Sequence, residues 1–367
     1  MTITVGAIHE SPVYSMQKMM RANHELPVRM LFILIGLLFL SACNPVTQTD
    51  ARLFYFGTVI EIRVYGERDP QPVLSEIESN LKQWHTRFHA WQPSELTELN
   101  TTLQRGASIT PADDMAIIIR RAHDLAEQSE QLFNPALGKR IAAWGFARDN
   151  MNDTTATPKT IDPKSLPTMR DLHWQGKQLR SSNPDLQLDL GGIAKGYALD
   201  EILNLLRARG FRNAMINIGG DIGVLGQTPQ RPWHIAIQNP DGSNTPLATI
   251  TLNDGEMAFT SGTYARQHAT ENGNAHHIID PRNGAPSQGN IAVTLVGRDG
   301  MLLQAACKVL LIAGNDWQRY ADKLNVANAY VVNKKSTIEL TATMMTLIDH
   351  AQTTQWRVVE ASPERDD

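Results

Sequence analysis

The stretch LDLGGIAKGYALDEI, residues 188–202, places two adjacent glycines and a lysine between a strand-like run and a helix-like run. Residues 193–209 predict a helix, and Gly210 is a natural residue to end it. The first turn of such a helix presents unpaired N–H groups and the positive end of a dipole, to which Lys195 adds a full charge. The junction therefore fits a phosphate group, and it fits a tight structural turn with a solvated lysine equally well.

Upstream of this junction, helical patterns dominate. Apolar residues recur at three- and four-residue spacing through residues 72–91, which predicts an amphipathic helix after a strand at Leu53–Tyr65. A second helix is expected from Thr110, whose hydroxyl can cap the first turn, with Pro111 at the tolerated first position, to about Glu130. FNPALGKRIAAWGF, residues 133–146, predicts a short third helix.

Downstream, short strand-like runs separated by turn residues dominate, with one further helix at 301–313 and a closing hairpin at 329–340. The sequence therefore predicts an α+β fold, with a helix-rich N-terminal half and a mainly antiparallel sheet in the C-terminal half. The strand-like runs are LQLDL, NAMINI, WHIAIQ, LATITL, EMAFTS and IAVTLV.

The beginning of the chain reads as an export signal. LFILIGLLFLSAC, residues 31–43, is a short apolar run after a basic segment, and its last four residues resemble the bacterial lipobox. We expect a signal peptide at 1–43 with a lipidated Cys43 as the mature N-terminus, a single domain at 50–350 and a tail at 351–367. An uncleaved anchor is the alternative. With only Cys43 and Cys307 in the chain, no disulfide is expected.

Three further features carry candidate chemistry. The loops TSGTYARQ (260–267) and HHIIDPRNGAP (276–286) gather hydroxyls, histidines and turn residues. His277 is a candidate general base or a structural residue beside an Asp-Pro turn. In MLLQAACKVLLIAG, residues 301–314, Gln304 and Lys308 lie on one helix face, which looks toward either bulk water or a ligand pocket.

In order and spacing, the lipobox, YFGT, SELTELN, LFNPALGKRIAAWGF, LDLGGIAKGYALDEI, NIGGDI, TSGTYARQ and HHIIDPRNGAP resemble the ApbE family of FAD:protein FMN transferases. The resemblance covers nearly all of the expected mature chain. It implies an α+β fold with FAD in a cleft. It also implies a Mg²⁺-dependent transfer of FMN from FAD to a Thr or Ser hydroxyl of an exported protein, with release of AMP.

The resemblance also implies roles for individual residues. Asp189 and Lys195 match positions that contact FAD, the Gly192 carbonyl matches a backbone metal ligand, and His277 matches the residue that deprotonates the acceptor hydroxyl. Trp91 replaces the usual tyrosine near the isoalloxazine ring, where an indole can stack as well. The other residues expected to bind the cofactor are Phe56, Leu132, Phe133, Asn134, Thr260, Ser261, Gly262, Ile279 and Asp280.

One departure from the family pattern concerns the metal. The family's metal-binding helix reads Ala-Asp-Ala-Leu-Ala-Thr, whereas this chain reads LQAACK, with Gln304 in place of the acid and Lys308 in place of the threonine. A neutral amide is a poor Mg²⁺ ligand and an ammonium repels the ion. We hypothesise that Lys308 occupies or borders the place of the cation. An active transferase, an FAD-binding carrier without turnover, and an FAD pyrophosphatase all remain open.

The resemblance further implies a partner and a location. The partner would be an exported flavoprotein bearing an acceptor Thr or Ser, with a respiratory complex subunit as the expected case. The location would be the periplasmic side of a bacterial membrane, inner or outer, reached through the lipid anchor. The net charge of −4 and the lack of a long basic run argue against nucleic acid as a partner.

Overall fold

A nine-stranded sheet organises the chain, and its pairs from β2 to β16 run antiparallel, whereas β16 and β18 pair in parallel. This arrangement confirms the predicted α+β fold with a mainly antiparallel sheet. In spatial order the strands are β1 (Thr47–Tyr55), β2 (Thr58–Gly66), β5 (Asn213–Ile218), β6 (Asp221–Leu225), β9 (Met257–Gly262), β14 (Ala292–Gly297), β15 (Asn328–Val332), β16 (Ile338–Thr341) and β18 (Trp356–Val359).

The computed structural model describes residues 46–147, 157–158, 161–271, 273–351 and 356–359. Residues 48–367 group into one unit. The predicted leader with Cys43 lies outside the described residues, so lipidation at that position stays a prediction. Among the helices that are described, none is both long and apolar enough to span a bilayer.

Smaller sheets complete the β structure. One has three strands in the order β17-β8-β7, and three others are two-stranded hairpins. Their bounds are β7 (Trp233–Ile237), β8 (Ala248–Leu252), β17 (Ile348–Ala351), β3 (Leu172–Gln175), β4 (Gln178–Ser181), β10 (Gln267–Thr270), β11 (Gly273–His276), β12 (Ile279–Asp280) and β13 (Ala285–Pro286).

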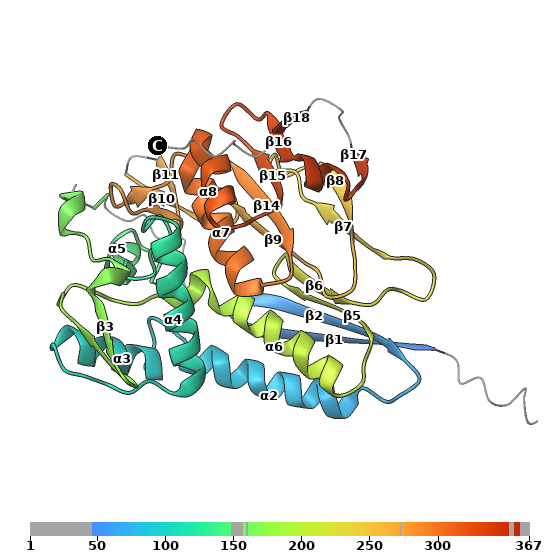
Figure 1. Cartoon of the computed structure of the whole chain (residues 1–367), viewed down its shortest axis with the longest axis horizontal. Helices are drawn as coiled ribbons and strands as arrows, with labels where there is room; N and C mark the ends of the chain where they lie inside the picture. Colours follow the sequence, from blue (N-terminus) through green and yellow to red (C-terminus); the bar gives the residue numbers. More distant parts are fainter. Residues whose placement is uncertain (1–45, 148–156, 159–160, 272, 352–355, 360–367) are drawn as a thin grey trace, which may run out of the picture. The chain divides into compact units, whose positions relative to one another are not determined.

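Helices α6 and α7 lie side by side, and α7 packs on β9 and β14 (Figure 1). The helices are α2 (Gln71–Arg87), α3 (Glu95–Gln104), α4 (Asp113–Gln128), α5 (Gly138–Ala143), α6 (Ala194–Ala208), α7 (Gly300–Ala313), α8 (Trp317–Lys323) and α9 (Ala342–Met345). The single 3₁₀ turns are η1 (Pro163–Ser165), η2 (Met169–Asp171), η3 (Leu190–Gly192) and η4 (Gly314–Asp316).

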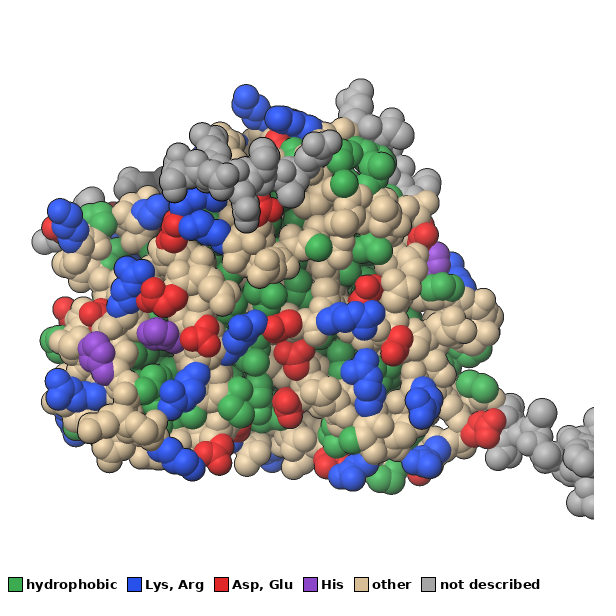
Figure 2. All heavy atoms as spheres, viewed as in Figure 1, with side chains coloured by type: hydrophobic (Ala, Val, Ile, Leu, Met, Phe, Trp, Pro, Cys, Tyr) green, Lys and Arg blue, Asp and Glu red, His purple; other side chains and the backbone are tan. Residues whose placement is uncertain are grey.

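The central strands are buried on both faces. In β14, Val293 and Leu295 pack into the core beneath the helices, whereas Ala292 and Val296 pack into a second core with β7 and β8. A strand covered on both sides needs a continuous apolar run rather than strict alternation. Residues 291–296, IAVTLV, form such a nearly continuous apolar run. Charged side chains of both signs are interspersed over the outer face in view (Figure 2).

Three sequence predictions about these elements are wrong. The first is the single strand at Leu53–Tyr65, which is in fact the end of β1, a turn and β2. Phe56 and Gly57 both adopt positive φ, at 55° and 69°, and this turns the chain back on itself. The turn escaped notice because phenylalanine rarely occupies a left-handed position.

The second wrong prediction is a helix capped by Thr110. Helix α4 begins at Asp113 after Ala112, without a side-chain cap. Ile109 exchanges two backbone hydrogen bonds with Leu179, of 2.9 and 2.7 Å, and this pairing holds the chain extended up to the start of the helix.

The third concerns LQLDL, residues 186–190, which is not a ladder strand. Gln187 forms only an isolated bridge to Leu137. Asn100 takes the place of a neighbouring strand, because its side chain donates to the Leu188 carbonyl at 2.9 Å and accepts from the Leu188 N–H at 2.8 Å. The predicted helices at 193–209 and 301–313 and the hairpin at 329–340 are confirmed.

Candidate active site

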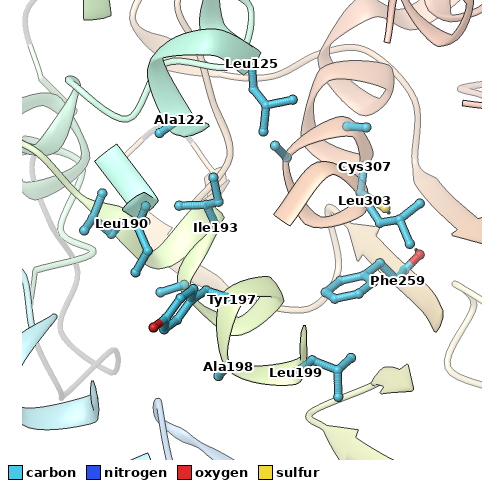
Figure 3. Packing of buried hydrophobic residues seen from close by; sticks show 14 of the residues in the cluster. Ala122, Leu125, Leu190, Ile193, Tyr197, Ala198, Leu199, Phe259, Leu303 and Cys307 are labelled. Carbon is cyan, nitrogen blue, oxygen red and sulfur yellow. Dashed lines mark hydrogen bonds between the residues drawn. The ribbon is translucent and has the colours of Figure 1, made fainter. Parts of the chain in front are cut away.

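The glycine junction between Asp189 and α6 is held in a fixed conformation. The Asp189 carboxylate accepts a hydrogen bond of 2.9 Å from the Gly191 N–H and so caps η3. Leu190 and Ile193, on either side of the glycines, are fully buried in the main core between α4 and α7 (Figure 3). Two buried anchors and a cap therefore fix the backbone of Gly191 and Gly192.

Gln304 of α7 joins the junction to the first turn of α6. Its Nε2 donates to the Gly191 carbonyl at 3.0 Å, and its Oε1 accepts from the Gly196 N–H at 2.8 Å. The side chain is 2% exposed. Gln304 therefore looks onto the glycine junction and not into bulk water, whereas the ligand pocket expected on this face of α7 stays a prediction.

Helices α6 and α7 meet backbone to backbone. A Cβ on Gly300 would lie 2.6 Å from the Gly196 carbonyl oxygen, and one on Gly196 would collide with the Gly300 carbonyl. Asp200 reinforces the contact by accepting from the N–H groups of Gly300 at 2.9 Å and Met301 at 3.3 Å. Burial raises the pKa of Asp200 to about 7. Only glycine at both positions allows so close a crossing.

Lys308 lies one helical turn after Gln304 and reaches the same junction. Its Nζ donates to the Gln304 carbonyl at 3.0 Å. A Cβ on Gly192 would lie 3.5 Å from the Cδ and Cε atoms of Lys308, so the lysine stem passes beside that glycine. Burial lowers the pKa of Lys308, and the carboxylates of Asp221 and Asp189 oppose that shift.

Lys195 is paired within the protein. Its ammonium forms an ion pair with Asp221, at the start of β6, whose carboxylate is almost fully buried. The same carboxylate accepts a long hydrogen bond of 3.4 Å from the N–H of Thr260, and the Thr260 and Thr294 hydroxyls lie 2.9 Å apart. Sequence reasoning missed Asp221 as a site residue, although it stands inside NIGGDI, one of the motifs that carry the family resemblance.

His277 lies between β11 and β12 with an unsatisfied nitrogen. Among the described residues, no hydrogen-bond partner reaches its buried Nδ1. Burial, followed by the cations of Arg266 and Lys308, lowers the pKa of His277 to about 3. The imidazole is therefore neutral at pH 7 and able to accept a proton.

Asp189 shares this electrostatic environment. Burial raises the pKa of its carboxyl, and the hydrogen bond from the Gly191 N–H and the nearby cations of Arg266 and Lys308 act against the shift. The structure thus brings Asp189, His277 and Lys308 into one neighbourhood with Arg266. Arg266 lies inside the motif TSGTYARQ, which is a signal in the sequence, but sequence reasoning did not include this residue among the candidates.

The sequence model of the ApbE family matches residues 56–331. The chain belongs to the ApbE family. The FAD:protein FMN transferase of Treponema pallidum is 30% identical, over 69% of this chain and 76% of that protein. That of Rhodobacter capsulatus is 36% identical over 77% of this chain, which spans 55% of the length of that relative.

Solved structures show the same fold. The ApbE protein of Thermotoga maritima is 24% identical and superposes with a TM-score of 0.75, over 83% of this chain and 100% of that one. The flavin transferase ApbE of Vibrio cholerae is 23% identical with a TM-score of 0.73, over 83% of this chain and 100% of that one. The expected ApbE-like fold is confirmed.

The aromatic residues predicted to hold the flavin have three different surroundings in this ApbE family member. Phe133 is buried and borders the junction, because a Cβ on Gly192 would lie 3.2 Å from its ring. Phe56 packs edge-on against His85, with ring centroids 6.0 Å apart. Trp91 is half-buried and lines a surface groove with residues of α3 such as Thr97. Their roles toward FAD stay predictions.

The other predicted cofactor residues make local contacts. Asn134 donates to the Pro167 carbonyl at 2.9 Å, and the Asp280 carboxylate binds Arg282 at 2.7 Å. Leu132 and Ile279 are core residues. Ser261 and Gly262 follow Thr260 at the end of β9. None of these contacts excludes a ligand, and none by itself requires one.

The residues at the junction do not fit the magnesium ion that the family resemblance implies. Gln304 turns its amide hydrogens, rather than an oxygen, toward the Gly191 carbonyl, and Lys308 brings an ammonium beside Gly192. Hard cations bind oxygen ligands and are repelled by both groups. Within the described ranges, no group of three or more His, Cys, Asp or Glu side chains is placed to hold a metal.

Proposed function

We propose that this chain transfers FMN from FAD to a Thr or Ser hydroxyl of an exported flavoprotein and releases AMP. The hydroxyl oxygen forms a new bond to the phosphorus of the FMN half. The bond between that phosphorus and the bridging oxygen of the diphosphate breaks, and AMP leaves with the bridging oxygen. His277 takes the proton of the hydroxyl.

The observation that carries this proposal is the neutral His277 beside two cations. Its Nδ1 has no protein partner among the described residues, and Arg266 and Lys308 contribute to its lowered pKa. Phosphoryl transfer to a hydroxyl needs a base for the proton and positive charge for the phosphate oxygens. A bound diphosphate would offset both cations and raise the basicity of His277 at the moment it is needed.

The remaining predicted residues are assigned to FAD in the same proposal. Phe56, Trp91, Leu132, Phe133 and Asn134 would hold the flavin side, and Asp189 and Lys195 the junction side. Thr260, Ser261, Gly262, Ile279 and Asp280 would complete the site. Magnesium receives no role, because the Gln304 and Lys308 donors do not fit it.

The partner and the location belong to the proposal as well. The relatives named FAD:protein FMN transferase support a protein acceptor, and a respiratory subunit facing the periplasm suits an exported enzyme. A lipid on Cys43 would hold the enzyme at that membrane surface. Mass spectrometry of the membrane-extracted protein tests the lipid directly.

One assay separates the functional classes. The mature chain is incubated with FAD and an acceptor domain, and the products are resolved by denaturing gel and by chromatography. A flavin-fluorescent acceptor band with an equal amount of AMP supports transfer, and His277→Ala should abolish the band while His173→Ala, at an exposed histidine, leaves it. FMN and AMP without acceptor would identify a pyrophosphatase. FAD binding without any product would identify a carrier.

A further inference from the structure

Lys308 stands out among the charged groups of the site because, in the described part of the chain, no carboxylate lies within ion-pair distance of it. Lys195 has Asp221 as its ion-pair partner, whereas Lys308 forms no ion pair in the described part of the chain. Within the described residues its single hydrogen bond goes to the Gln304 carbonyl, so two of the three ammonium hydrogens have no protein acceptor there. A half-buried ammonium in this state is unfavourable until an anion arrives.

The side chain of Lys308 is half-buried beside the glycine junction. The next residue along the chain toward the N-terminus, Cys307, points into the core and donates to the Phe259 carbonyl at 3.3 Å (Figure 3). The lysine stem passes beside Gly192, since its Cδ and Cε atoms lie at van der Waals distance from the place where a Cβ on that glycine would be. The charge is therefore fixed next to the glycine junction.

Gln304 makes the same place unsuitable for a divalent cation. A cation bound there would have to displace the Nε2 donor from the Gly191 carbonyl and sit close to the Lys308 ammonium. The amide hydrogen satisfies the Gly191 carbonyl, which directly precedes the Gly192 carbonyl that the family resemblance assigns to a cation. The junction thus has a positive charge and a satisfied carbonyl without any bound ion.

From these contacts we propose that Lys308 supplies the positive charge that neutralises the diphosphate of FAD, in place of a divalent cation. This inference rests on the proposed function, since it assumes that FAD is the ligand of the junction. It makes Lys308 a substrate-binding residue and Gln304 the residue that positions it. FAD binding to this chain then requires no divalent metal.

The test measures FAD affinity by fluorescence quenching of the flavin, in EDTA and in excess Mg²⁺, with no acceptor present. The unaltered protein should bind FAD equally well in both solutions. Lys308→Met should weaken binding by about 10- to 100-fold, because a charge-assisted contact to phosphate is lost. Lys177→Met, at an exposed lysine of the β3–β4 turn, is the matched control and should bind as the wild type does.

A double variant restores the acid and the threonine of the family pattern, and so tests whether FAD binding then depends on Mg²⁺. Gln304→Asp with Lys308→Thr removes the amide donor and the ammonium together, so FAD binding should become weak in EDTA and recover in Mg²⁺. Loss of FAD binding by the unaltered protein in EDTA would overturn the proposal, and this measurement needs no variant to fold. Wild-type affinity in Lys308→Met would overturn it too.

The transferase function and the charge role of Lys308 can be tested separately. If the unaltered protein binds FAD in EDTA but labels no acceptor in either solution, the charge role of Lys308 stands and the transferase function falls. If it labels the acceptor only in Mg²⁺ and also needs Mg²⁺ to bind FAD, the transferase function stands and the role of Lys308 falls.

Discussion

The Nε2 of Gln304 donates to the Gly191 carbonyl at 3.0 Å, while the Oε1 of the same side chain accepts from the Gly196 N–H. One amide thus satisfies a carbonyl before α6 and an N–H inside it. Because both backbone groups are enclosed, the side chain has a structural role whether or not a ligand is bound.

Replacing Gln304 by leucine should destabilise the ligand-free protein by about 2–4 kcal/mol, because two backbone groups lose their partners and each unsatisfied group costs about 1–3 kcal/mol. Urea unfolding measures the change. Gln104→Leu is the control, since that side chain makes one 3.2 Å bond to the Leu186 carbonyl at a less enclosed position. Equal losses in the two variants would contradict the role of Gln304.

Lys308→Met should make the ligand-free protein more stable, even though it weakens FAD binding. The methionine fills a similar volume, and removing a half-buried charge that forms no ion pair among the described residues gains about 1–3 kcal/mol. The Gln304 carbonyl loses little, because carbonyls inside a helix already accept from the N–H four residues later. Thermal unfolding without FAD measures the gain. A less stable Lys308→Met would show that the charge is already compensated.

Acid should destabilise the protein through His277. The pKa of this group falls from 6.5 in an exposed chain to about 3 in the folded protein, so the unfolded state binds more protons between these values. The contribution of the neutral His277 to the free energy of unfolding is fully present above pH 6.5. It should fall by about 1 kcal/mol for each pH unit below that value. In His277→Gln that dependence should be shallower than in His173→Gln. Parallel pH profiles would contradict a neutral, buried His277.

Gly196→Ala should disrupt the crossing of α6 and α7. The added methyl collides with the Gly300 carbonyl, which belongs to the backbone and cannot rotate away. Overpacking of this kind costs about 1–3 kcal/mol, measurable by urea unfolding. Gly66→Ala, where the nearest atom to the new Cβ is 3.9 Å away, is the control. FAD binding should weaken only in Gly196→Ala, because α7 carries Gln304 and Lys308.

Sequence patterns predicted the parts of the fold that depend on local periodicity. Helices α2, α6 and α7 and the β15–β16 hairpin follow from the spacing of apolar residues and from turn residues. LQLDL failed because its apolar spacing is that of a strand, but a side chain, Asn100, supplies the partners that a strand would need. The five residues of LQLDL do not indicate that Asn100, 88 positions earlier in the chain, forms these hydrogen bonds.

The sequence allowed individual site residues to be predicted, but not the contacts between them. Gly191, Gly192 and Gln304 could each be noticed from residue type, but their hydrogen bonds join segments far apart in the chain. The ion pair of Lys195 with Asp221 was also out of reach, because it depends on β6 lying beside α6. Spacing along a sequence indicates which residues share a helix or strand. The contacts between helices and strands can be known only from the three-dimensional fold.

The one-turn separation of Gln304 and Lys308 constrains how this pair of residues could have arisen. An acid at 304 with the lysine at 308 would form an ion pair along α7 and cancel the charge meant for the substrate. A glutamine at 304 without the lysine would leave the junction with no free positive charge of its own. Each single exchange is therefore disadvantageous alone, and we expect homologous chains to carry the two residues together or to carry neither.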